Sequence, residues 1–396
     1  MINADISNIW GDVSLRDLLE QEDRILNAHR TLCGGTGKGA VYGAWMNLPD
    51  TLPEKMNKAA NLIRLDSDIL VVIGDNSATR GIRAIIELLQ GLHRNLGKGQ
   101  GDPMILFTGD SLSPGYWNDL THLLEGKDYS LCVIAGDTLS TESAIALRNM
   151  KWMLERKYGT NDAMCRIYAV TDPQQGVLRQ MARDEKWETF DLPAGIGEDF
   201  SLLCPGCWLP LAVAGINMES LLKGIRDAQE EYNLGSFENP VWLYTAARKL
   251  MAESGKTMQL LASPEPGMAA FGKWWQGLFT GSTGMAPLVM ELSSDQAVVD
   301  HLIRNTPRSI FETMLRFEAP EKKITIAQDK TDLDGLKALA DKPMATVQED
   351  AFFRMQDSHA DSGSAVMTLE CPRLCEETLG ELIWFFQLSR ALELML

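Results

Sequence analysis

Residues 133–148 read Val-Ile-Ala-Gly-Asp-Thr-Leu-Ser-Thr-Glu-Ser-Ala-Ile-Ala-Leu-Arg, and this stretch decides the fold. The apolar run at 131–135 is typical of a buried parallel strand, and a helix is predicted to begin around Ser140. A helix start directs free backbone N–H groups and a positive dipole end at the preceding turn, which suits an anion. This turn offers Asp137 and neither Lys nor Arg. The predicted geometry therefore favours an anion site, whereas the charge opposes it. We predict that the Asp137 carboxylate itself acts as the anion and accepts backbone N–H groups at the helix start.

The alternation of apolar strand and helix extends to both sides of this stretch. Strands are predicted at 68–73, 103–108, 131–135, 166–171 and 188–192, with helices at 79–92, 116–125, 141–158 and 176–186. Apolar strands joined by helices predict right-handed crossovers and a parallel sheet. Ligands of such sheets bind at the carboxyl ends of the strands, so the turns after Ile73 and Ala135 are candidate sites.

A second unit is predicted after residue 200. Helices are predicted at 201–216, 218–232, 241–254, 268–279 and 378–396, and strands at 257–262 and 288–292. The first residues, 1–34, have an amphipathic helical pattern. The sequence therefore predicts an N-terminal helical segment (1–34), a first α/β subdomain (35–200) and a second subdomain with a C-terminal helix (201–396).

The composition excludes several classes of function. The chain has 396 residues, of which 45% are hydrophobic, and a formal net charge of -17. An acidic surface of this kind argues against nucleic acid and against anionic membranes as partners. No apolar run approaches the roughly 18 residues of a membrane span, and the N-terminus lacks the basic region of a signal peptide. We expect a soluble cytoplasmic protein.

The seven cysteines include one close pair, Cys204 and Cys207, in the sequence Cys-Pro-Gly-Cys. This spacing occurs in redox dithiols and in half of a zinc site. Cys371 and Cys375 are a second pair that could complete such a site only if the fold brought them near. Because apolar residues flank the first pair, buried structural thiols are the favoured interpretation. The role of the pair stays open, and we predict no metal and no cofactor.

Several stretches together resemble the glucose-6-phosphate isomerase family, in its shorter bacterial form. They are residues 166–172 with Gly176, residues 209–216, Asn239-Pro240, residues 255–257, Trp274-Trp275 with Leu278-Phe279, and residues 332–336. The resemblance implies an α/β fold of two SIS-type (sugar-isomerase) αβα sandwich subdomains with mainly parallel sheets. It also implies a homodimer with the active site near the interface.

The family's binding turns are altered in this chain. Its Gly-Ile-Gly-Gly-Ser turn corresponds to Ile73-Gly74-Asp75-Asn76-Ser77, where two side chains obstruct the approach of a sugar phosphate. Its phosphate turn, Ser-Lys-Ser/Thr-x-Thr-Thr, corresponds to residues 135–140 and continues into Thr141. The lysine is replaced by Gly136 and a hydroxyl by Asp137, while Ser140, Thr141 and the following Glu142 are kept.

The family's catalytic positions are also altered. The arginine of Gly-Gly-Arg-x-Ser is replaced by Asp199, which follows Glu198. The catalytic base of Gly-Glu-Ser-x-Gly-Lys is replaced by Gly281, ahead of Ser282, and the ring-opening histidine by Ala297. His301 lies one helical turn further on, where a surface histidine is the favoured interpretation, and His359 aligns with a family histidine.

We weigh three functions. The first, which we prefer, is an isomerase homologue that has lost its catalytic residues and acts as a binding or interaction protein. The second is a working glucose-6-phosphate isomerase with relocated residues, such as Glu142, Asp199, His301 or His359. The third is a cleft whose small ligand is neutral or cationic rather than a sugar phosphate. The residues assigned to this cleft are Asp75, Asn76, Ser77, Asp137, Ser140, Thr141, Glu142, Glu198, Ser282, His301 and His359.

Overall fold

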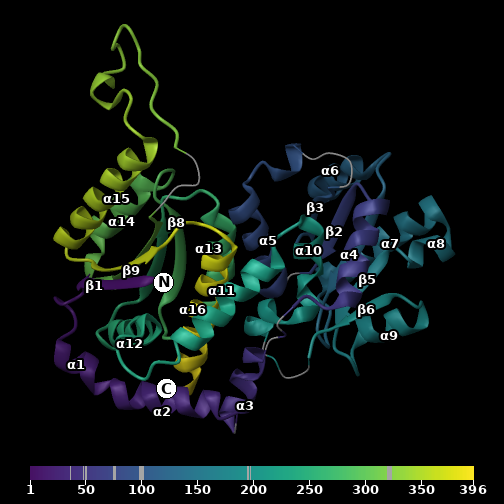
Figure 1. Cartoon of the computed structure of the whole chain (residues 1–396), viewed down its shortest axis with the longest axis horizontal. Helices are drawn as coiled ribbons and strands as arrows, with labels where there is room; N and C mark the ends of the chain where they lie inside the picture. The colour runs from purple at the N-terminus through teal and green to yellow at the C-terminus, as the bar shows by residue number, and fades with distance from the viewer. Residues whose placement is uncertain are drawn as a thin grey trace. The chain divides into compact units, whose positions relative to one another are not determined.

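The computed structural model describes residues 1–35, 37–47, 49, 51–74, 77–97, 102–193, 196, 198–318 and 323–396. The chain divides into two compact units, drawn in Figure 1. Unit 1 comprises Met1–Arg30, Lys223–Gly272 and Phe279–Leu396. Unit 2 comprises Thr31–Leu222 and Lys273–Leu278. These limits differ from the predicted ones: residues 1–30 belong to unit 1, whereas residues 31–34 and 201–222 belong to unit 2.

Unit 2 contains the predicted parallel sheet. Its strands are β2 (Ile69–Ile73), β3 (Met104–Thr108), β4 (Tyr129–Ile134), β5 (Ile167–Thr171) and β6 (Glu188–Asp191). They lie in the order β3-β2-β4-β5-β6, and each neighbouring pair is parallel. The helices between them are α5 (Ser77–Gln90), α6 (Pro114–Leu124), α7 (Thr141–Tyr158), α8 (Thr160–Met164) and α9 (Val177–Asp184). The mainly parallel α/β fold is therefore confirmed.

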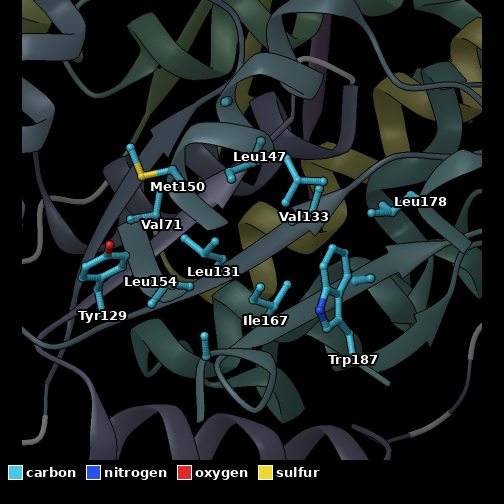
Figure 2. Close-up of a cluster of buried hydrophobic side chains, with 14 of the residues drawn as sticks. Val71, Tyr129, Leu131, Val133, Leu147, Met150, Leu154, Ile167, Leu178 and Trp187 are labelled. Atoms are coloured by element: carbon cyan, nitrogen blue, oxygen red, sulfur yellow. The ribbon is translucent and has the colours of Figure 1, made fainter. Parts of the chain in front are cut away.

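The core of unit 2 explains this arrangement. All residues of β2 and β4 are buried, because helices cover both faces of a parallel sheet. Figure 2 shows Leu131 and Val133 of β4 among Leu147, Met150 and Leu154 of α7. The spacing of these three helical residues puts them on one face of α7. The strand, turn and helix start at residues 133–148 are thus held in place by the apolar contacts between β4 and α7.

The predicted helix at 201–216 is wrong. The chain forms two short 3-10 helices, η3 (Glu198–Leu203) and η4 (Pro205–Trp208), and then a brief α10 (Leu209–Ala214). Pro205 and Pro210 each occupy a first turn, because proline lacks the N–H that a helix interior requires. The remaining helices of unit 2 are α3 (Lys38–Tyr42), η1 (Ala44–Met46), α4 (Glu54–Asp66) and η2 (Arg94–Gly97).

Unit 1 is built on a second sheet, in the order β1-β10-β9-β7-β8. Its strands are β1 (Asn3–Asn8), β7 (Met258–Ser263), β8 (Ala286–Glu291), β9 (Ile310–Phe317) and β10 (Ala365–Cys371). Only the β1–β10 pair is antiparallel. The prediction that residues 1–34 are entirely helical is therefore wrong, and β9 and β10 were not predicted.

Further helices lie before, between and after these strands in the sequence. They are α1 (Leu15–Glu20), α2 (Glu22–Cys33), α11 (Met218–Glu231), α12 (Pro240–Glu253), α13 (Met268–Phe279), α14 (Gln296–Asn305), η5 (Pro307–Ser309), α15 (Met344–Asp361) and α16 (Glu376–Met395). The apolar run of α16, from Leu382 to Phe386, is buried within the single chain. It therefore supplies core rather than an exposed dimer surface.

An arm of residues 323–343 projects from unit 1 between β9 and α15 (Figure 1). Its two sides are joined by backbone hydrogen bonds, such as that from Ile326 N to Lys342 O (3.0 Å). At its tip, Asp332 Oδ1 accepts from Lys337 N at 2.8 Å. Leu333, at this tip, is 92% exposed. The arm, including the short η6 (Lys337–Leu339), is therefore joined by its own hydrogen bonds, while Leu333 at its otherwise mostly polar tip faces solvent.

Candidate functional site

The carboxyl ends of β2, β3 and β4 come together in unit 2 and leave little room for side chains. A Cβ added to Gly74 would lie 2.8 Å from the carbonyl oxygen of Ile134. A Cβ added to Gly109 would lie 2.9 Å from the amide nitrogen of Gly74. Ser143 Oγ donates to Gly109 O at 2.9 Å and fixes the turn after β3 against α7. These glycines let the turns pack closely at the ligand edge of the sheet.

The turn before α7 is capped by Ser140. Its Oγ accepts from Ser143 N at 3.1 Å, while Thr141 is exposed and Glu142 is half-buried. The side chain of Asp137 is exposed and makes no hydrogen bond or ion pair with any described residue. The hypothesis that the Asp137 carboxylate accepts the free N–H groups at this helix start is therefore wrong. Ser140 stands three positions before Ser143, which is the spacing that capping requires.

This difference predicts unequal effects of two substitutions. Ser140→Ala should lower the free energy of unfolding by about 1 kcal/mol, because it removes a side-chain cap. Asp137→Ala should change it by less than about 0.5 kcal/mol, as is usual for an exposed residue without partners. Denaturant unfolding of both variants measures the contrast. Equal losses for the two variants would show that the aspartate caps the helix in solution.

Other candidates in unit 2 are only partly described. Asp75 and Asn76 lie outside the described residues, and for Glu198 only the backbone is described, at the start of η3. Ser77 is buried at the start of α5, and its Oγ donates to Asp199 O at 3.2 Å. The fold therefore joins Ser77 to the half-buried Asp199, although the two residues are far apart in the sequence.

In unit 1, the turn that corresponds to the family's catalytic-base loop lies between α13 and β8. Gly281 has φ +71, in the left-handed region, and no atom of the described chain lies within 4 Å of a Cβ added there. Space is therefore available, but the backbone disfavours any residue with a side chain, by roughly 1–2 kcal/mol. The neighbouring Ser282 is half-buried.

A buried arginine, which the sequence did not single out, holds this turn. Arg248 of α12 is 0% exposed, and its Nη2 donates to Ser282 Oγ at 2.9 Å. Nε and Nη2 both donate to Gln259 Oε1, at 2.9 and 2.7 Å. Nη1 lies 3.2 Å from Glu393 Oε2, and the guanidinium carbon lies 3.8 Å from the ring centroid of Phe279. A charged residue inside the apolar run of α12 was the available sequence signal.

The histidine candidates separate into two environments. Ala297 and His301 are exposed on α14, so the surface interpretation of His301 agrees with the structure. His359 is 1% exposed, and its Nδ1 lies 2.8 Å from Glu312 Oε2 of β9. Its Nε2 lies 3.4 Å from Asp300 Oδ1 of α14. The ring of His359 is thus held inside unit 1 by two carboxylates, and its assignment to a ligand cleft stays a prediction.

Burial opposes a charge on His359, but its hydrogen bonds and the charges of Glu312 and Asp300 outweigh burial and raise the pKa of the imidazole. A raised folded-state pKa contributes stability that is fully present below the unfolded value of 6.5 and is lost as pH rises through the folded value. We therefore expect the difference in unfolding free energy between wild type and His359→Gln to shrink as pH rises above 6.5. Denaturant unfolding across a pH series measures it. His301→Gln is the control, and a similar loss of pH dependence in that variant would contradict the assignment.

The Cys204 and Cys207 thiols are free and buried in unit 2. Burial raises the pKa of Cys204 to about 12 and that of Cys207 well above its ordinary value. Protonated, inaccessible thiols are poor nucleophiles, which agrees with the structural interpretation. Cys371 and Cys375 belong to unit 1.

Within the described ranges, no cluster of His, Cys, Asp and Glu side chains could hold a metal ion. In the same ranges, no helix is long and apolar enough to cross a membrane.

Comparison with known proteins agrees with this architecture. No protein-family profile matches the chain. A hypothetical protein from Thermus thermophilus superposes with a TM-score of 0.85 at 20% identity, covering 100% of this chain and 94% of that one. A glucose-6-phosphate isomerase from Chlamydia trachomatis superposes with a TM-score of 0.74 at 13% identity, covering 100% and 84%. Two units built on mainly parallel sheets thus give the α/β fold of SIS-type sugar isomerases.

Sequence comparison identifies the family. Glucose-6-phosphate isomerase from Shouchella clausii is 35% identical over 99% of this chain and 89% of its own length. That from Acetivibrio thermocellus is 36% identical over 98% of this chain and 89% of its own. The chain belongs to the glucose-6-phosphate isomerase family.

Proposed function

We propose that this family member does not isomerise sugar phosphates and acts as a binding or interaction protein on the isomerase scaffold. The observation that carries the proposal is Gly281. Aldose–ketose isomerisation moves a proton between two carbons and needs a positioned base. The position that matches the family base carries no side chain and has a left-handed backbone, φ +71. Ala297, at the ring-opening position, likewise offers no acid or base.

The relatives favour a second candidate function, because those that are about 35% identical carry the name glucose-6-phosphate isomerase. An active isomerase would need relocated groups. Of the candidates, His359 is buried between carboxylates, and His301 is exposed on α14 with its backbone carbonyl accepting from Asn305. Glu142 is half-buried beside the α7 start, and Asp199 is half-buried in η3. An active isomerase would also need a cationic group beside the reacting carbons to stabilise an enediolate.

We further propose that any small ligand of the unit 2 turns is neutral or cationic. Asp137 is exposed at the turn after β4, and Asp199 follows in η3, where the family offers a hydroxyl and an arginine. Arg80, exposed in the first turn of α5, supplies an opposing positive charge. The free N–H groups of a helix start contribute only about 1–2 kcal/mol to anion binding, less than the roughly 4 kcal/mol of a millimolar affinity.

Calorimetric titration tests the proposed ligand. We expect glucose-6-phosphate and 6-phosphogluconate to show no saturable binding tighter than about 1 mM. Polyamines and divalent cations are the cationic ligands titrated in the same screen. Submillimolar binding of a sugar phosphate that Arg80→Ala abolishes would overturn the proposal, because it would show a working anion site. Lys58→Ala, on the exposed surface of α4, is the matched control for lost charge.

We propose that the protein forms a homodimer in the cytoplasm and that the arm of unit 1 takes part in the contact. The side chain of Leu333 on the arm is 92% exposed, so it makes few contacts within its own chain. In a dimer, this apolar side chain would be buried against a second copy. Light scattering should give twice the chain mass of 43.9 kDa. Leu333→Asp should shift the equilibrium toward monomer, whereas Leu96→Asp, on the exposed surface of unit 2, should not. A wild-type monomer at micromolar concentration would contradict the proposal.

A further inference from the structure

A cavity of about 360 Å³ lies in unit 2 beside the free edge of the sheet, away from the turns at the strand ends. Residues of α5, η2, β3 and α6 line it, together with residues between α5 and η2. We call it the edge cavity. Its volume falls in the range of pockets that hold small organic molecules, which begins at about 300 Å³.

The walls of the edge cavity combine apolar side chains with polar and charged ones. Tyr116, Asp119, Leu120 and Leu123 of α6 all line it. Their spacing of three, four and seven residues makes them a single helical face. Leu92 and Leu123, at 52% and 45% exposed, also line it. One side of α6 thus presents large apolar side chains to a space that no described residue fills.

The edge of β3 is closed to an added strand. Ile105 N donates to Asn95 Oδ1 at 3.2 Å, and Asn95 Nδ2 donates back to Ile105 O at 3.0 Å. The Tyr116 hydroxyl donates to Phe107 O at 2.7 Å. These side chains occupy backbone groups that a peptide strand would need, so strand addition is disfavoured. The cavity therefore suits a compact molecule.

The polar groups that line the edge cavity differ in whether they already have hydrogen-bond or ion-pair partners. Arg94 is buried, and its guanidinium donates to Asn95, Pro103 and Ala214. Arg83 Nε is paired with Glu87 Oε1 at 2.7 Å, so this pair brings no net charge. Asp119 makes no hydrogen bond or ion pair with any described residue.

Tyr116 and Asp119 lie one turn apart on the same face of α6. The hydroxyl hydrogen of Tyr116 is used by Phe107, so its oxygen offers only acceptor capacity. The carboxylate of Asp119 is also an acceptor, and it is charged. A group that fits both is an ammonium, because it donates several hydrogen bonds and carries the opposite charge.

We propose that the edge cavity binds a primary amine that carries an aromatic or branched apolar body. The ammonium is held by Asp119 and the Tyr116 oxygen, and the apolar body lies against Ile86, Ile105 and Leu123. This site is separate from the strand-end turns and does not depend on whether the protein isomerises sugar phosphates.

Isothermal titration of the full chain with phenethylamine tests the proposal, with 3-phenylpropionate as an anion of similar shape. Phenethylamine should saturate in the low millimolar range or tighter, and the anion should bind at least about tenfold more weakly. Asp119→Asn should weaken phenethylamine about tenfold. Glu125→Gln, which removes an exposed carboxylate just beyond α6, should leave binding unchanged.

Four outcomes overturn the proposal. They are absence of saturable phenethylamine binding, equal binding of the anion, undiminished binding to Asp119→Asn, and an equal effect of Glu125→Gln. Because Asp119 is exposed and unpaired in the described structure, its replacement should leave the thermal unfolding midpoint unchanged, so lost binding will not reflect lost folding.

Discussion

Glucose-6-phosphate incubated with the purified protein is expected to yield no fructose-6-phosphate above the uncatalysed background in a coupled assay. General acid–base catalysis typically contributes 10²–10⁴-fold, and each preorganised charge donor about 10²–10³-fold more. Under the proposed function, Gly281 and Ala297 stand where the family has the base and the ring-opening histidine, and Asp199 stands where it has an arginine. Losing these contributions together should leave any residual rate far below the ordinary range of about 1–1000 per second.

The matched control for this assay is the Shouchella clausii relative, which is 35% identical and carries the isomerase name. Under the same conditions it should turn over. The double variant Gly281→Glu with Ala297→His should not restore full activity, because Asp199 still stands in place of the arginine and the left-handed backbone at 281 strains the new side chain. Turnover by the wild-type chain within the ordinary enzyme range would contradict the proposed function and favour relocated catalytic groups.

The central strands of unit 2 were predictable because they are mostly apolar and buried. β2 consists of five buried aliphatic residues, and that run alone identifies a central parallel strand. β9 and β10 were missed for the opposite reason. β9 contains Glu312 and Arg316, whose partners His359, Glu349 and Glu370 lie far along the sequence. A charged residue that is buried against a partner far along the sequence cannot be told from a surface residue when only its sequence neighbours are considered.

The same limit applies to the candidate site. The loss of side chains at Gly281 and Ala297 was visible in the sequence, because the family motif aligns there. The left-handed backbone at Gly281 was not visible, since a glycine is compatible with any φ. The capping role was assigned to Asp137 rather than Ser140 because both residue types cap helices, and the choice depends on where the helix begins. The backbone conformation at Gly281 and the choice of capping residue depend on the folded structure.

Replacing Arg248 with methionine is expected to give the largest loss of stability, about 3–5 kcal/mol. Methionine keeps an unbranched apolar stem but removes the guanidinium. Gln259 Oε1 would lose both of its donors from Arg248, and Ser282 would lose its partner at 2.9 Å. Glu393, whose side chain is only 10% exposed, would keep Arg390 Nη1, at 3.4 Å, as its one ion-pair partner among the described residues. A buried carboxylate left without its main partner is the costly part of this change.

Denaturant unfolding of three further variants separates the causes of that loss. Arg248→Lys should also destabilise, because an ammonium cannot reproduce the planar fork that reaches Gln259, Ser282 and Glu393 together. Arg248→Met combined with Glu393→Leu should recover part of the loss, since it removes the unpaired charge as well. Arg16→Ala, which breaks the exposed pair with Glu20, should change stability by less than about 1 kcal/mol. A loss below about 1 kcal/mol for Arg248→Met, or no recovery in the double variant, would show that the Arg248–Glu393 pair does not hold the Gly281 turn in place.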